Sequence, residues 1–159
     1  MVIYVILYAD KVTGKDGNFS YLVNAVHTAY FTKESAEAHA EEYEEDDRIV
    51  EVHPIDIDLF SGIPWERDIY IMACYTQDFQ FDGRKSKLFV TASSPNSETL
   101  VSYMAFLAHL NDQNGWKIVD SYPMQRKMVF KNDDFSLQIR LCCVHLPHDI
   151  ADRVRYVEE

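Results

Sequence analysis

Two histidines, a cysteine and an aspartate lie close together near the end of the chain, and all three residue types bind metal ions. Cys143 and His145 are two residues apart, and His148 and Asp149 follow. Thiolate sulfur, imidazole nitrogen and carboxylate oxygen are typical zinc ligands, and the gap between the two histidines resembles a known ligand spacing. No CxxC or HxH pair accompanies the group, so a complete site would need a residue from elsewhere in the fold. The structural alternative is a buried thiol followed by a loop with two ordinary histidines.

The sequence carries none of the short motifs that identify common catalytic sites. It lacks GxGxxG, GxxxxGK[ST], GxSxG and HExxH. We therefore expect no catalytic residue and no cofactor. The enzymatic or metal-binding alternative is limited to His145, His148 and Asp149, with Cys143 as an additional ligand.

A second group of charged residues lies in the first half of the chain, where six acids fall within seven residues. The run is Glu41-Glu42-Tyr43-Glu44-Glu45-Asp46-Asp47, and Glu34 and Glu37 precede it. On a helix these acids recur about every turn and would display negative charge on a broad face. Carboxylates at the C-terminal end of a helix oppose its macrodipole, so a purely structural helix would gain from lysine there. The two interpretations are a contact surface for a basic partner and a solvated face that keeps the protein soluble.

The elements that must position these residues are repeated along the chain. Ile3-Tyr4-Val5-Ile6 returns as Ile69-Tyr70-Ile71-Met72, and residues 49–54 return as residues 118–123. Between these anchors each half has the pattern strand, strand, helix, strand, and a further hairpin follows over 126–145. The predicted fold is α+β, with duplicated β-β-α-β units, an additional C-terminal β-hairpin, and a mostly antiparallel sheet with two helices packed on it.

The chain divides into a first unit over 1–58, a linker over 59–68, and a second unit with hairpin and tail over 69–159. Either one continuous sheet crosses both units, or two small sheets pack through their helices. The pattern also predicts that the second strand, over 19–31, bends near Asn24.

Capping residues set the expected helix boundaries. Thr32 is a good N-cap, and the first helix is predicted over 33–45 with a narrow stripe of small residues facing the sheet. The second helix is predicted to begin after Asn96 or Ser97 and to present a broader apolar face.

The net charge of −11 is concentrated in the first half of the chain. Residues 1–68 carry five Lys/Arg and fifteen Asp/Glu, which gives −10, and residues 69–159 carry ten and eleven, which gives −1. An acidic chain is a poor binder of nucleic acid, because phosphate contacts need clustered Lys and Arg. We therefore expect a basic protein as the partner and no direct nucleic acid binding.

Cysteine usage and the N-terminal segment indicate the compartment. Three cysteines are an odd number, and Cys142 and Cys143 are adjacent on a predicted strand, so reduced thiols on opposite faces are expected. The apolar run over 2–9 is too short to span a bilayer and lacks a basic leader and a cleavage site. A cytoplasmic protein without membrane contact is expected.

The first half resembles a hairpin–helix–strand unit that is frequent in phage-borne and bacterial accessory proteins. The residues that carry the resemblance are Ile3-Tyr4-Val5-Ile6, Phe31-Thr32-Lys33-Glu34-Ser35-Ala36-Glu37 and Ile49-Val50-Glu51-Val52. In style, the whole chain is similar to phage-encoded inhibitors of host defence, which are small, acidic and compact and some of which imitate DNA. The resemblance implies an inhibitor that acts in the host cytoplasm. The charge here lies in one half rather than along the whole fold, which departs from the DNA-mimic pattern.

The leading hypothesis is a non-enzymatic protein-binding module, an inhibitor that covers a basic, nucleic-acid-binding surface of its partner. The predicted contact residues lie on and after the first helix: Glu37, Glu41, Tyr43, Glu44, Glu45 and Asp47. Their carboxylates would replace phosphates in a cationic groove. Besides the metal site, the remaining alternative is a homo-oligomer, in which a basic end of one copy meets the acidic helix of another.

Overall fold

The computed structural model describes most of the chain as ten regular elements. The described residues are 2–13, 15, 17, 19–56, 68–78, 87–94, 97–113, 117–122, 127–131 and 135–146. The elements are β1 (Val2–Thr13), β2 (Phe19–Ala25), α1 (Lys33–Tyr43), β3 (Arg48–Asp56), β4 (Asp68–Asp78), β5 (Lys87–Ser94), α2 (Ser97–Gln113), β6 (Lys117–Tyr122), β7 (Lys127–Lys131) and β8 (Phe135–His145). The order β-β-α-β occurs twice and is followed by a hairpin. This confirms the predicted α+β fold class.

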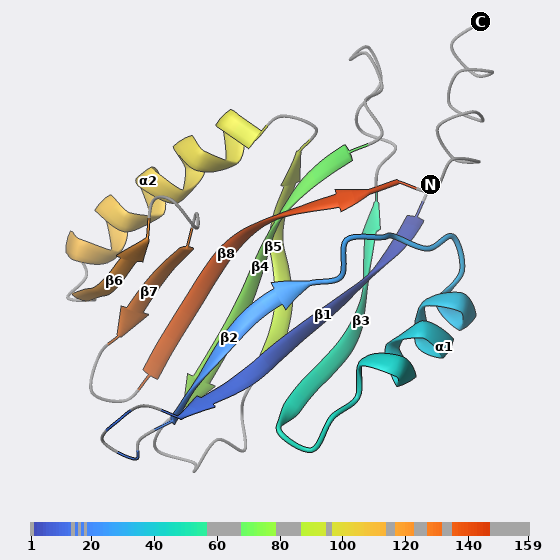
Figure 1. The fold of residues 1–159 in the computed structure, drawn as a ribbon. Coiled ribbons are helices and arrows are strands. Elements are labelled where there is room, and N and C mark those ends of the chain that lie inside the picture. The colour runs from blue at the N-terminus through green and yellow to red at the C-terminus, as the bar shows by residue number, and fades with distance from the viewer. Residues whose placement is uncertain are drawn as a thin grey trace, which may run out of the picture.

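The strands form two antiparallel sheets, and the two halves pair their strands differently (Figure 1). Sheet A has the order β2-β1-β3, and sheet B has the order β5-β4-β8-β7-β6. In sheet A the third strand of the unit, β3, pairs directly with β1. In sheet B that position beside β4 belongs to β8. The C-terminal hairpin therefore lies between β4 and β6, the first and last strands of the second repeat.

The two sheets pack face to face and share one apolar core. Every second residue of β1, from Ile3 to Ala9, and every second residue of β4, from Ile69 to Tyr75, belongs to this core. Sheet A lies in front of the central strands of sheet B in Figure 1. The sequence allowed either one continuous sheet or two sheets packed through their helices. The structure has neither arrangement, because the two sheets are separate and contact each other directly. Strands that are apolar on both faces need cover on both, and here one face is covered by the other sheet.

The two helices cover the outer faces of the sheets. Helix α1 packs on sheet A through its buried residues Ala36 and Ala40, and Ala40 packs with Ile6 of β1. Helix α2 packs on sheet B through Leu100 and Met104. The four layers are therefore α1, sheet A, sheet B and α2. No helix in the described part of the chain is long and apolar enough to cross a membrane.

Helix α1 begins where the sequence predicts and ends two residues earlier. The Thr32 side chain accepts a hydrogen bond from the Ser35 amide, 3.2 Å away, and so caps the helix. The predicted end at Glu45 is wrong, because Glu44 is already extended, with φ −68° and ψ 126°. The Arg48 guanidinium donates a hydrogen bond of 3.0 Å to the carbonyl of Tyr43, one of the carbonyls that the helix end leaves unpaired.

A short segment after β2 ties the two sheets together at one corner. Strand β2 ends at Ala25, so the predicted continuation of this strand to residue 31 is wrong. The chain then bridges β1 between Tyr30 and Tyr4 and bridges β8 between Thr28 and His145. The segment thus makes backbone contact with both sheets, which fixes the end of β8 against the first half of the chain.

Candidate functional site

The predicted partner-binding residues lie at the C-terminal end of α1 and in its connection to β3. Glu37 and Glu41 are on the helix, Tyr43 is its last residue, and Glu44, Glu45 and Asp47 follow. These belong to a set of eight exposed carboxylates, which we name the acidic surface: Glu34, Glu37, Glu41, Glu42, Glu44, Glu45, Asp46 and Asp47. Tyr43 is half-buried, and its ring stacks on Tyr8 with 6.2 Å between ring centres. It therefore takes part in the packing of α1 on sheet A.

Only a small part of the acidic surface is neutralised by the described cations. Lys33 lies 3.7 Å from Glu37, and Arg48 lies 3.7 Å from Glu45. No ion pair joins the other six carboxylates to a described Lys or Arg. The Lys33–Glu37 pair is itself largely exposed, with side-chain exposures of 64% and 55%, so it contributes little energy. The acidic surface thus keeps most of its negative charge.

Arg48 is engaged mainly with the fold rather than with the acidic surface. Its Nε atom donates a hydrogen bond of 2.5 Å to Asp10 on β1, and its guanidinium lies over the Tyr8 ring at 5.0 Å. The hydrogen bond to Asp10 raises the pKa of Arg48. Together with its bond to the carbonyl of Tyr43, these contacts fix the end of α1 against β1, the central strand of sheet A.

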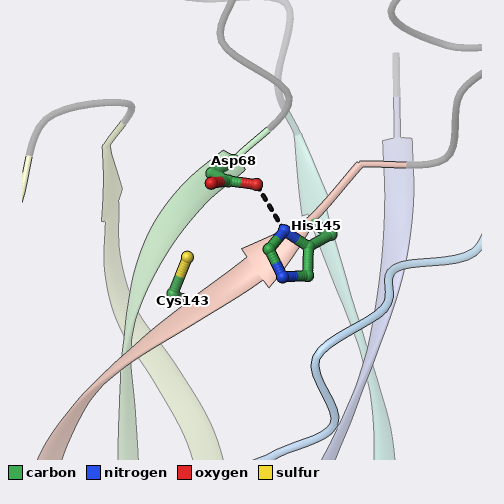
Figure 2. A group of neighbouring side chains, drawn as sticks. All are labelled: Asp68, Cys143 and His145. Carbon is green, nitrogen blue, oxygen red and sulfur yellow. Dashed lines mark hydrogen bonds and ion pairs between the residues drawn. The ribbon is translucent and has the colours of Figure 1, made fainter.

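The structure also brings Cys143 and His145 together with Asp68, which the sequence did not single out. Asp68 begins β4 and lies opposite His145 near the end of β8, and Tyr70 lies opposite Cys143. The ligand atoms of Asp68, Cys143 and His145 all lie within 4.8 Å of one another, and His145 Nδ1 forms a hydrogen bond with Asp68 Oδ1 (Figure 2). We name this group the Asp68–Cys143–His145 cluster.

The surroundings of the Cys143 thiol shift its pKa upward. Partial burial and the nearby Asp68 carboxylate raise the pKa of Cys143, while a hydrogen bond with the Tyr70 side chain lowers it. The neutral thiol is a weak nucleophile, so a positively charged ligand would be needed to favour the thiolate here. The other two predicted ligands, His148 and Asp149, lie outside the described residues.

The remaining two cysteines are buried on opposite faces of sheet B. Cys142 lies in the core between the sheets, and Cys74 lies under α2. All three thiols are free, as the sequence predicts, and the adjacent Cys142 and Cys143 point to opposite faces. Burial raises the pKa of Cys74 and of Cys142 to about 11. Both thiols are therefore in the neutral form at neutral pH.

Comparison with protein families, with curated proteins and with solved structures finds no match. The functional argument therefore depends on the geometry of the acidic surface and of the Asp68–Cys143–His145 cluster.

Proposed function

We propose that the protein is a non-enzymatic binding module whose acidic surface docks on a basic protein. The observation that carries the proposal is that six of the eight carboxylates have no ion pair with a described cation while all eight are exposed. Uncompensated like charges repel one another, so the free protein gains nothing electrostatically from this crowding. A cationic partner would relieve the repulsion and would be attracted over long range.

The way in which α1 is attached supports this role. The helix contacts sheet A through small residues, Ala36 and Ala40, so it lies close to the sheet and leaves its outer face uncovered. No basic residue lies in its last turn, where a cation would favour the helix dipole. The carboxylates at that end cost helix stability and add negative charge to the exposed face. This is the pattern expected if the charge serves a contact.

The proposed mechanism is occlusion of a nucleic-acid-binding surface. Carboxylates spaced about one helical turn apart would take the place of phosphates in a cationic groove of the partner. The partner would then be unable to bind its nucleic acid, which makes the module an inhibitor. A phage-encoded protein of this kind would act in the host cytoplasm.

Affinity capture from a lysate of the native host tests the proposal. The immobilised protein is compared with two triple variants of equal net charge. The surface variant is Glu41→Lys, Glu44→Lys and Glu45→Lys, and the control variant is Asp133→Lys, Asp134→Lys and Glu158→Lys, from the second half of the sequence. We expect the native protein to capture a basic, nucleic-acid-binding protein that elutes with salt. The control variant should capture the same protein, and the surface variant should not. Capture by the native protein and the surface variant alike would contradict it.

A further inference from the structure

We propose that Asp68, Cys143 and His145 bind a divalent cation of the zinc class at the end of the β4–β8 pair. The proposal is independent of the acidic surface, which lies on α1 and its connection to β3. It differs from the sequence hypothesis in its ligands, because Asp68 joins Cys143 and His145 from a strand far away in the sequence. Figure 2 shows the three side chains directed toward a common region beside the two strands.

The donor atoms select the type of ion. The cluster offers one sulfur, one imidazole nitrogen and one carboxylate oxygen. Calcium and magnesium prefer sites built from oxygen alone, whereas zinc and neighbouring transition metals accept thiolate and imidazole ligands. A set of three protein ligands is also typical of zinc sites that keep the fourth position for a water molecule. The chemistry of the donors therefore favours Zn²⁺, with Co²⁺ as a spectroscopic substitute.

The distances are close to those of a tetrahedral site. Zinc–ligand bonds of about 2.0–2.3 Å place neighbouring ligand atoms of a tetrahedral site roughly 3.3–3.8 Å apart. In the structure the three ligand atoms already lie within 4.8 Å of one another. His145 Nδ1 and Asp68 Oδ1 are already at hydrogen-bond distance, so closing the site around an ion requires side-chain shifts on the order of 1 Å.

The backbone at the site is held in place from two sides. The register of β4 with β8 sets Asp68 opposite His145. On the other side of the strand, the His145 amide donates a hydrogen bond of 2.6 Å to the carbonyl of His27, and the His145 carbonyl accepts one of 3.1 Å from the Ala29 amide. The ligands are thus fixed by regular strands and by the segment that ties the sheets together, which reduces the entropy lost on binding.

The cluster is accessible to an ion from solvent and retains a neighbour that would support the thiolate. The side chains of His145 and Asp68 are 59% and 39% exposed. Tyr70, whose side chain acts to lower the pKa of Cys143, lies directly opposite it in the β4–β8 pair. A hydroxyl that donates to a metal-bound sulfur is the kind of outer contact that orients a ligand. A bound ion would connect the start of β4 to the end of β8 and would stabilise the folded state by mass action.

The test is a titration of the reduced, chelator-treated full-length protein with Co²⁺, followed by competition with Zn²⁺. The expected result is a thiolate–cobalt charge-transfer band that saturates at one Co²⁺ per chain. The band should disappear when Zn²⁺ is added. Zn²⁺ should also raise the melting temperature, and Mg²⁺ at the same concentration should not. Absence of the band at stoichiometric Co²⁺ overturns the proposal, and this result needs no variant.

Variants then assign the ligands. Cys143→Ser should remove the charge-transfer band, while Cys142→Ser, which changes the adjacent thiol on the opposite face, should retain it. Asp68→Asn and His145→Ala should each weaken Zn²⁺ binding at least about tenfold. Glu51→Gln, an exposed acid on β3, is the control for a change of carboxylate. If the band persists in Cys143→Ser, the ion binds elsewhere and the assignment is overturned. Unchanged Zn²⁺ affinity in both Asp68→Asn and His145→Ala would overturn it as well.

Discussion

The side chain of Gln138 on β8 forms hydrogen bonds with the backbone of β2 in the opposite sheet. Its Oε1 atom accepts from the amide of Val23, and its Nε2 atom donates to the carbonyl of Tyr21 at 2.8 Å. Strand β2 is at the edge of sheet A, so these backbone groups have no neighbouring strand on that side. Gln138 is buried, and its side-chain amide supplies the hydrogen bonds that a neighbouring strand would otherwise make with these backbone groups. One side chain therefore connects the two halves of the chain.

We predict that replacing Gln138 destabilises the whole fold. Gln138→Leu would remove the hydrogen bond to the Tyr21 carbonyl and would deprive the buried amide of Val23 of its bond to Gln138, and the loss at Val23 costs about 1–3 kcal/mol. Chemical denaturation measures the change in the free energy of unfolding. Gln77→Leu, at a half-buried glutamine of the neighbouring strand β4, is the matched control and should have a smaller effect. Equal effects of the two substitutions would show that the hydrogen bonds to β2 contribute nothing specific.

Arg48 is expected to stabilise the end of α1. Arg48→Ala would remove the hydrogen bonds to Asp10 and to the carbonyl of Tyr43, and we expect a loss of roughly 1–2 kcal/mol in the free energy of unfolding. Arg48→Lys should recover only part of this loss, because an ammonium group does not reproduce the planar guanidinium that contacts both partners and the Tyr8 ring. Full recovery by lysine would mean that charge alone matters at this position.

Stability should fall in mildly acidic solution partly because of His53. Burial, and secondarily the charge of Lys87, lowers the pKa of His53 on β3 below its ordinary value of 6.5. At a pH between the pKa of His53 in the folded protein and its pKa of about 6.5 in the unfolded chain, His53 is protonated mainly in the unfolded chain. Lowering the pH below about 6.5 therefore favours unfolding. His53→Gln should reduce the loss of stability between neutral pH and about pH 5, measured by denaturation at each pH. His39→Gln on α1 is the control, and an unchanged pH dependence in His53→Gln would contradict the prediction.

The three thiols should differ in reactivity. With a pKa of about 11, Cys74 and Cys142 are ionised in about one molecule in a thousand at about pH 8, whereas Cys143 is less deeply buried. Iodoacetamide should therefore modify Cys143 first in the native protein. Mass spectrometry of native protein, of Cys143→Ser and of urea-unfolded protein measures this. Rapid modification of native Cys143→Ser would contradict the burial of the other two thiols.

Much of the fold was predictable because the signals are local. Thr32 caps α1 as expected, and the alternation along β8 places Leu141, Cys143 and His145 on one face. The position of the C-terminal hairpin was not predictable. By analogy with the first unit, in which β3 pairs with β1, β6 would pair with β4, but β8 takes that place. Which strand becomes the neighbour depends on long-range packing, which leaves no mark in a short window of sequence.

The Asp68–Cys143–His145 cluster was likewise only partly predictable, because it also depends on which strands pair. Cys143 and His145 share a face because side chains alternate along a strand, and the sequence was sufficient for that step. Asp68 is 77 residues away from His145 and becomes its neighbour only through the pairing of β4 with β8. In the sequence it is one acid among many in an acidic half. The acidic surface, by contrast, was visible in advance, since its eight carboxylates all fall within residues 34–47.

The most direct test of the acidic surface measures binding to a defined cationic probe, poly-L-lysine, at ionic strengths of about 0.05 M and about 0.3 M. The native protein, the surface variant (Glu41→Lys, Glu44→Lys and Glu45→Lys) and the control variant (Asp133→Lys, Asp134→Lys and Glu158→Lys) are compared, the two variants having the same net charge. We predict that salt weakens native binding strongly, that the control variant stays within a few-fold of the native affinity, and that the surface variant loses at least about tenfold. Equal affinities of the two variants, or native binding that salt does not change, would contradict the account.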